Sequence, residues 1–297
     1  VDLDNIPPDD PPTYALLNRA DTKGVFQLES EGMRGLIREV GIGNLDDLGA
    51  VIALFRPGPM DMLPAYKARK SGREKVVYDH PLLEPILKDT YGVMVYQEQV
   101  QRAANVLAGY SLSEADMLRR AMGRKDPAIM ARERGRFVEG CARVNAIPRE
   151  LAERIFDNIA AFAGYGFNKS HAVGYSIIAL QTAYMKANFP AEFMAAQISS
   201  EIGNFDKLPG FVTEAAAMGL AVLPPDVNHS EARFVPEGEG IRFGLAGIKN
   251  VGEGAAAAIV AQGRAAIRSC ILTQVILSRH TSSALPPPGS ATRQRWW

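Results

Sequence analysis

The residues best suited to chemistry lie in the segment Ala163–His171, where a glycine-rich stretch runs directly into a long apolar region. Gly164 and Gly166 make a flexible turn ahead of the expected helix. A helix N-terminus attracts anions because its first N–H groups are unpaired and its dipole is positive there. Lys169 and His171 add cationic or hydrogen-bonding side chains, so the segment is suited to hold phosphate.

The same pattern also fits a purely structural role. A helix that ends at a glycine, followed by Ser170 as the N-cap of the next helix, needs no ligand. Local physics leaves these two interpretations open. The segment is not a Walker loop, because Asn168 precedes Lys169 where that loop has glycine and because the glycine spacing differs.

A second candidate is the basic run that opens at Arg119. Residues 119–143 hold eight lysines and arginines against three acidic residues, a net charge of plus five. Arg120 and Arg124 are four residues apart and share a helix face, and the arginine fork matches phosphate oxygens. A solvated helix face is the other interpretation of such a run.

Two further segments carry polar residues next to turns. Arg56 stands at the entrance of the rigid turn Pro57-Gly58-Pro59, which is explained equally well as a turn alone. Gln97-Glu98-Gln99 opens a helix after the apolar, strand-like Val93–Tyr96. An exposed polar helix start accounts for these three side chains.

Acidic residues in a pattern for catalytic metal are not found. Two-metal nucleotidyl transfer needs carboxylates on a rigid element. The candidate pairs fall in a frayed segment or at turns and helix starts: Asp2 and Asp4, Asp9 and Asp10, Asp46 and Asp47. No histidine and cysteine cluster suggests zinc, and no serine elbow or cysteine–histidine pair suggests a hydrolase.

Composition places the chain among globular proteins. Its 297 residues suffice for one large or two ordinary domains, and 33 basic residues balance 33 acidic ones, so a nucleic-acid-binding patch must be local. The two cysteines, Cys141 and Cys270, have no metal-ligand spacing and favour a reducing cytoplasm. No signal peptide or membrane-spanning run is present, so we expect a soluble, cytoplasmic protein. The chain starts at Val1 without methionine, which suggests a start inside a longer reading frame.

Elements that would position these residues can be placed along the chain. Residues 1–12 are acidic and proline-rich and predict an irregular linker. From Thr13 to about Ser200 the apolar spacing is helical. Asp126-Pro127 and Ile147-Pro148 predict helix starts, since proline is tolerated in a first turn. Ser113 and Asp116 have the spacing of a capping box. The helices expected in this part cover residues 113–122, 127–144, 149–162 and 171–188.

The character changes after Pro224-Pro225. Residues 232–235 and 241–244 flank Gly238 and Gly240 and predict a β-hairpin. An alanine-rich helix is expected to follow, to about Ala261. Residues 264–297 carry scattered serine, threonine, arginine and proline without periodicity, which predicts a disordered tail.

Five segments together resemble one family, the alpha subunit of bacterial DNA polymerase III, a C-family replicative polymerase. The resemblance covers roughly Val1–Gly263. It rests on motifs in the family's order, namely Gly24–Met33 (GVFQLESEGM), Ala53–Pro59 (ALFRPGP), Tyr96–Val100 (YQEQV), Ala115–Gly123 (ADMLRRAMG) and Phe162–His171 (FAGYGFNKSH).

The resemblance implies a mainly α fingers region that contacts an incoming dNTP and the primer–template DNA. Carried over by position, it implies triphosphate contacts by Arg119, Arg120, Lys169, His171 and Arg56. We assign DNA contacts to Arg124, Lys125, Lys249, Gly252 and Gly254; the last two lie in a segment that resembles the first hairpin of a helix-hairpin-helix module.

The implied division of the chain has four parts: a linker from the palm (1–12), fingers (13–226), a β-hairpin with an incomplete helix-hairpin-helix start (227–263) and a tail unrelated to the family (264–297). The second half of the hairpin module would be expected after Gly263. The family's Mg²⁺-binding palm aspartates would lie in segments before Val1, so the chain alone is expected to be inactive. Its partners would be DNA, dNTP and the other polymerase domains, with a sliding-clamp contact in doubt.

Two alternatives stay open at this point. The chain could act as a helical nucleotide- or nucleic-acid-binding module without catalysis, which salt-sensitive binding would reveal. It could also be an unrelated phosphate-binding NTPase, which ATP hydrolysis would reveal, although the missing Walker pattern argues against this.

Overall fold

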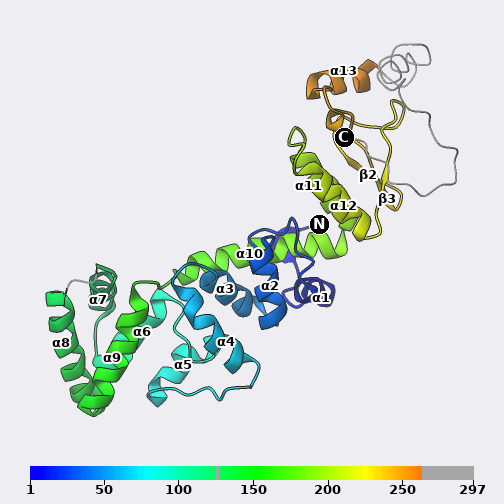
Figure 1. Ribbon diagram of the computed structural model, residues 1–297. Coiled ribbons are helices and arrows are strands. Elements are labelled where there is room, and N and C mark those ends of the chain that lie inside the picture. The colour runs from blue at the N-terminus through cyan, green and yellow to red at the C-terminus, as the bar shows by residue number, and fades with distance from the viewer. Residues whose placement is uncertain (125–126, 263–297) are drawn as a thin grey trace. The chain divides into compact units, whose positions relative to one another are not determined.

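A computed structural model of the chain describes residues 1–124 and 127–262 (Figure 1). These residues are mainly helical with one three-stranded sheet, which confirms the predicted fold class. The chain divides into two compact units, Val1–Tyr184 and the residues from Met185 onward. Within the described ranges, no helix combines the length and the apolar character needed to cross a bilayer.

The first unit begins with short helices. They are η1 (Leu3–Asn5), α1 (Pro11–Arg19), α2 (Glu31–Val40), α3 (Leu45–Leu54), η2 (Pro59–Met62), α4 (Leu63–Lys70), η3 (Pro81–Leu83), α5 (Glu84–Leu87) and η4 (Lys88–Thr90). The expectation of irregular structure through Pro12 is wrong. Helix α1 already begins at Pro11, because the Asp10 carboxylate accepts the Thr13 N–H at 3.0 Å and proline suits the first turn.

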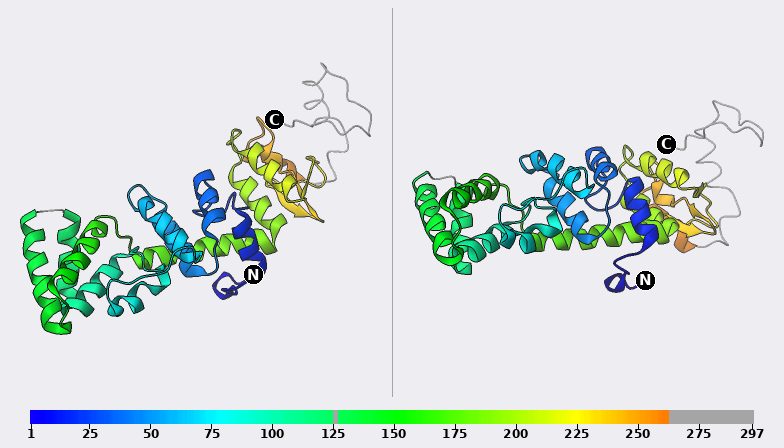
Figure 2. Two further views of the ribbon diagram at one scale, coloured as in Figure 1. Left: turned by 60° about the horizontal axis from the view of Figure 1, so that its bottom comes forward. Right: turned by 90° about the horizontal axis from the view of Figure 1, so that it is seen from below.

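The next four helices form a bundle of their own, α6 (Gln97–Ala108), α7 (Leu112–Arg124), α8 (Pro127–Asn145) and α9 (Arg149–Ala163) (Figures 1 and 2). Leu107, Phe137 and Phe156 are among the buried side chains at its centre. Both predicted proline starts are confirmed, since α8 begins at Pro127 and α9 directly follows Pro148.

The cap of α7 differs from the prediction. Ser111, not Ser113, caps the helix: its hydroxyl accepts the Glu114 N–H at 3.3 Å, and the Glu114 carboxylate accepts the Ser111 N–H at 2.9 Å. This is a capping box two residues earlier than expected. The expected partner Asp116 is therefore released from capping, and its carboxylate binds other side chains.

Helix α10 (Lys169–Asn188) follows, and the boundary between the two units falls within it. One face is buried at Ala172, Ser176 and Ala179, whereas Ile177 and Ile178 are exposed. Small residues on the buried face allow close contact with α3. A Cβ atom at Gly49 of α3 would lie 3.2 Å from the Ser176 hydroxyl.

The second unit contains α11 (Pro190–Ser200), α12 (Leu208–Ala217), β1 (Ala221–Leu223), β2 (Val235–Glu237), β3 (Gly240–Arg242), η5 (Leu245–Gly247) and α13 (Glu253–Gln262). The predicted β-hairpin is confirmed: β2 and β3 are antiparallel, with Val235 opposite Arg242 and Glu237 opposite Gly240. Gly238 supplies the positive φ of 58° that the turn requires.

Strand β1 was not expected, and it pairs in parallel with β3. Its three residues are too few to show alternation, so sequence periodicity does not reveal it. The pairing depends on Gly240, where a Cβ atom would lie 2.4 Å from the Ala221 carbonyl oxygen. The predicted tail at 264–297 lies outside the described residues.

Candidate functional site

The segment before α10 is held against the residues that lead into α6. The Phe167 N–H donates to the Val95 carbonyl at 3.1 Å, and the Gln97 N–H donates to the Phe167 carbonyl at 2.8 Å. These bonds form a parallel bridge between Tyr96 and Phe167. The motif Tyr96–Val100 and the motif Phe162–His171 are thereby placed side by side.

Arg56 reaches this bridge from the turn after α3. Its guanidinium carbon lies 4.4 Å from the centroid of the Phe167 ring. Its Nη2 donates to the Tyr165 carbonyl at 3.0 Å, and its Nε donates to the Ala53 carbonyl at 2.8 Å. Burial lowers the pKa of Arg56, but an arginine stays charged at neutral pH. Arg56 therefore brings a fixed positive charge to the start of α10.

His171 and Lys169 lie at the same bridge. The His171 ring is 5.3 Å from the Phe167 ring and 4.0 Å from the Tyr175 ring, measured between centroids. The Lys169 ammonium lies 5.6 Å from the centroid of the Tyr96 ring. Three of the five side chains predicted to contact a triphosphate thus lie around the paired residues Tyr96 and Phe167.

The N-terminus of α10 is not free for a ligand in the way the sequence suggests. The Glu98 carboxylate accepts the Lys169 N–H at 2.9 Å and the Asn168 side-chain amide at 2.9 Å. The Asn168 side-chain oxygen in turn accepts the His171 N–H at 2.9 Å. These two backbone donors already have acceptors, so an anion at this position would have to be bound mainly by the side chains of Lys169 and His171.

The view of Gln97-Glu98-Gln99 as an exposed polar helix start is also wrong. The Gln97 side chain donates to the Gly166 carbonyl at 2.9 Å, and Glu98 holds the start of α10. Gln99 is buried, and its Oε1 accepts the N–H groups of Val95 and Tyr96 at 2.8 and 2.9 Å. All three side chains hold the start of α10 and the residues before α6 together, and the signal that could have revealed this role is their place in the motif Tyr96–Val100.

Arg119 and Arg120 share one acidic partner on α7. Arg119 Nε lies 3.0 Å from Asp116 Oδ1, and Arg120 Nε lies 2.7 Å from Asp116 Oδ2. Spacings of three and four residues place both guanidinium groups beside the same carboxylate. The pKa of Asp116 is lowered, first by the hydrogen bond from Arg119, so the carboxylate is charged at neutral pH.

Helix α6 connects this pair of arginines to the start of α10. The Gln101 side-chain amide donates to Asp116 Oδ1 at 2.9 Å. Glu98, which holds Lys169 and Asn168, lies three residues earlier on α6. Residues three apart lie on one helix face, so the two groups of cations are attached to the same face of α6.

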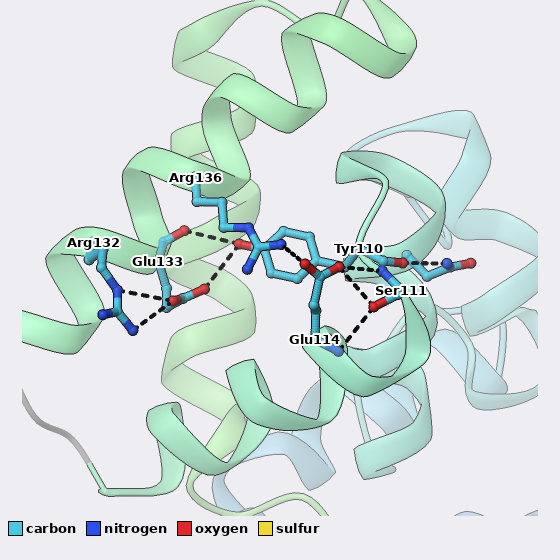
Figure 3. A network of polar contacts seen from close by, with 7 residues as sticks. Tyr110, Ser111, Glu114, Arg132, Glu133 and Arg136 are labelled. Atoms are coloured by element: carbon cyan, nitrogen blue, oxygen red, sulfur yellow. Dashed lines mark hydrogen bonds and ion pairs between the residues drawn. The ribbon is translucent and has the colours of Figure 1, made fainter.

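A second set of contacts orients α7 from its other end (Figure 3). The Arg136 side chain of α8 pairs with Glu114 and lies 4.5 Å from the centroid of the Tyr110 ring. The Tyr110 hydroxyl lies 3.3 Å from the buried Glu133 carboxylate, which also pairs with Arg132 at 3.2 Å. Glu114 of α7 is thereby tied to α8, which sets the direction in which α7 carries its arginines.

These contacts also limit the predicted basic run. On α8, Arg132 pairs with Glu133, Arg134 with Asp157 and Arg136 with Glu114. The acidic partners offset the charge of these three arginines, so the net positive charge of the run on α8 is smaller than the number of its arginines suggests. The side chains of Arg124 and Lys125, two of the predicted DNA contacts, lie outside the described residues.

The remaining predicted DNA contacts are in the second unit. Lys249 is exposed in the turn between η5 and α13, next to Asn250, which has a positive φ of 71°. Gly252 and Gly254 are exposed at the start of α13, and nothing lies within 4 Å of the position of a Cβ atom at either one. Backbone can approach a ligand closely at such positions.

Residues 1–124 and 127–262 contain no group of three or more histidine, cysteine and acidic side chains that could hold a metal ion.

Comparison with known proteins identifies the class to which this architecture belongs. Residues 1–145 match a family model described as the bacterial DNA polymerase III alpha subunit finger domain. Residues 219–277 match a helix-hairpin-helix motif, and this match extends past the described residues into the predicted tail.

Relatives that match over most of this chain give the same result. The chain is 51% identical over 265 residues to the DNA polymerase III alpha subunit of Thermus aquaticus, covering 88% of this chain and 22% of that relative. It is 51% identical over 267 residues to that of Pseudomonas aeruginosa, covering 87% of this chain and 23% of the relative. The chain belongs to the bacterial DNA polymerase III alpha subunit family, matches its finger domain over residues 1–145, and spans about a fifth of the length of these relatives.

Proposed function

We propose that this segment binds the triphosphate of an incoming dNTP through two groups of cations joined by α6. One group is Arg56, Lys169 and His171 at the start of α10, and the other is Arg119 and Arg120 on α7. The observation that supports this proposal is the attachment of both groups to one face of α6, through Glu98 and through Gln101. Neither group alone carries enough charge to balance a triphosphate.

Such cations would serve phosphoryl transfer by neutralising charge. As the primer oxygen attacks the α-phosphate, negative charge grows on the departing phosphates, and positioned arginine and lysine side chains stabilise it. Arginine can donate to two phosphate oxygens at once, whereas lysine acts as a point charge. The five side chains would thus bind and orient the triphosphate.

The second unit would hold DNA. The turn at Lys249 and the start of α13 present exposed backbone N–H groups and a cation, which is the chemistry that contacts phosphate without reading sequence. Arg124 and Lys125 are proposed to add phosphate contacts from the end of α7. The matched helix-hairpin-helix motif supports this role.

The chemical step would use Mg²⁺ held by carboxylates of the parent enzyme. The 297-residue chain is proposed to bind substrates but not to extend a primer. Incubation with primer–template DNA, dNTPs and Mg²⁺ tests this proposal, and any template-directed extension by the purified chain would overturn it.

Nucleotide binding is tested separately by equilibrium titration of the chain with a dNTP. Arg119→Ala and Lys169→Ala should each weaken binding about tenfold or more, in line with the loss of a charge-assisted phosphate contact. Arg149→Ala is the matched control, because Arg149 pairs at 2.9 Å with Glu153 at the first turns of α9, the end of that helix opposite to the one that leads into α10. Equal effects of all three substitutions would contradict the proposal.

A further inference from the structure

Asp116 makes three polar contacts with its one carboxylate. Oδ1 accepts from Arg119 Nε at 3.0 Å and from Gln101 Nε2 at 2.9 Å, and Oδ2 pairs with Arg120 Nε at 2.7 Å. Each oxygen therefore holds one guanidinium group, and the Gln101 contact ties the carboxylate to α6. Within residues 1–124 and 127–262, no second carboxylate pairs with either arginine.

This arrangement determines which edges of the arginines face outward. A guanidinium group is planar, and its Nε and Nη atoms point in fixed, different directions. Because Asp116 contacts the Nε atom of each arginine, the end edge formed by the two Nη atoms does not face the carboxylate. Solvent reaches 67% of the Arg120 side chain and 22% of the Arg119 side chain.

We infer that Asp116 is a positioning residue. It holds Arg119 and Arg120 side by side, in an orientation that lets them bind two neighbouring phosphate groups of a polyphosphate. The inference rests on the proposed nucleotide site and adds a selectivity to it. Two guanidinium groups on one carboxylate are close enough to bind adjacent phosphates, one each. A ligand with a single phosphate would engage only one of them.

The direction in which Asp116→Ala changes the affinity for polyphosphate distinguishes a positioning role from a purely electrostatic one. Asp116→Ala removes a negative charge beside an anion site, and Coulomb's law alone then predicts tighter binding of anions. Loss of positioning predicts the opposite, because both arginines would sample many rotamers and lose their shared orientation.

The test is titration of the 297-residue chain with inorganic tripolyphosphate, pyrophosphate and phosphate at one low ionic strength. For Asp116→Ala we expect tripolyphosphate and pyrophosphate to bind about tenfold more weakly, a typical cost of misplacing a binding group. Phosphate affinity should change little. Unchanged or tighter polyphosphate binding would overturn the inference.

Asp116→Asn provides a second, nearly isosteric variant. Its side-chain oxygen can still accept from Arg119 and Gln101, but its amide would face the Nε donor of Arg120. Polyphosphate affinity between those of the native chain and Asp116→Ala is therefore expected. An affinity equal to or above the native value would count against positioning.

Two further variants keep failure of the inference distinct from failure of the proposed function. Glu153→Gln removes the partner of another helical arginine, Arg149, and should leave polyphosphate binding unchanged. Arg119→Ala/Arg120→Ala should abolish the preference for polyphosphate. If this double variant binds normally, the nucleotide site itself is wrong. If it loses binding while Asp116→Ala does not, only the role of Asp116 is wrong.

Discussion

The central carbon of the Arg56 guanidinium group lies 4.4 Å from the centroid of the Phe167 ring, although 111 positions separate the two residues in the sequence. The same side chain donates to the carbonyl groups of Ala53 and Tyr165. One arginine therefore links the turn after α3 to the segment that starts α10, and it combines a structural role with the charge expected of a phosphate contact.

Arg56→Lys should not preserve this link, because lysine keeps the charge but lacks the planar fork. We expect a loss of about 1 kcal/mol in the free energy of unfolding, the size of one hydrogen bond and one exposed cation–π contact. Urea denaturation measures it. The control is Arg154→Lys, where the arginine is exposed and pairs with Asp79 at 3.4 Å. Equal stability of Arg56→Lys and the native chain would contradict the assignment.

Gly58 allows the turn after Arg56 to approach Tyr165. Its φ is 99°, and a Cβ atom there would lie 2.5 Å from Tyr165 Cδ1. Gly72 also has a positive φ, 72°, but nothing lies within 4 Å of its Cβ position. Gly72→Ala should therefore cost only the backbone strain of about 1–2 kcal/mol, and Gly58→Ala distinctly more. Urea denaturation of both variants checks the order, and equal losses would show that Tyr165 yields without cost.

Glu114 predicts a specific acid sensitivity at the start of α7. Hydrogen bonds from the Ser111 N–H and hydroxyl, and then from Arg136, lower the pKa of Glu114 to about 2. A carboxylate whose pKa is depressed in the folded state stabilises the fold at pH values above the ordinary glutamate pKa. This stabilisation is lost as the pH falls toward the folded-state pKa. As the pH is lowered from about 4.5 to about 2, the melting temperature of Glu114→Gln should therefore fall less steeply than that of the native chain. Parallel curves for the two proteins would exclude this contribution.

Lys186 and Glu214 form a buried ion pair in the second unit. Their Nζ and Oε1 atoms are 2.7 Å apart, and the lysine side chain is 0% exposed against 18% for the glutamate. Removing one partner of a buried pair costs about 3–5 kcal/mol, since the other charge stays buried. Glu214→Leu should destabilise more than Lys186→Met, because water reaches the carboxylate but not the ammonium.

The double variant Lys186→Met/Glu214→Leu completes this test. With both charges removed together, the free energy of unfolding should recover most of the loss seen in either single variant. Urea denaturation of the three variants measures the coupling. Additive losses would mean that the two side chains stabilise the unit independently.

Lys249 is the exposed cation in the turn before α13. Lys249→Ala should weaken binding to labelled primer–template duplexes of different sequence by similar factors and reduce the salt slope by about one, as expected for a phosphate contact. Fluorescence anisotropy over a range of salt concentrations measures both. Lys207→Ala is the control, because Lys207 is an exposed lysine elsewhere in the second unit. A sequence-dependent loss would indicate base contact instead.

Much of the fold could be predicted because its signals act within a single helical turn. Pro127 and Pro148 mark helix starts by the chemistry of the first turn alone. The hairpin of β2 and β3 follows from Gly238 and Gly240 between apolar residues. The cap of α7 was misplaced because Ser111 and Ser113 both stand near an acidic residue three positions on, and only the backbone path decides between them.

In the candidate site, too, some features could be predicted from the sequence and others depend on tertiary structure. The sequence alone pointed to its cations. Residue types and spacing suggested Arg120, Lys169 and His171, and the resemblance to the polymerase family added Arg56 and Arg119. Their supports were decided by tertiary structure. Glu98 meets the N–H of Lys169 across 71 residues, and Arg56 meets the Tyr165 carbonyl across 109. Contacts over such separations depend on how α3, α6 and α10 pack, and no pattern within one segment encodes that packing.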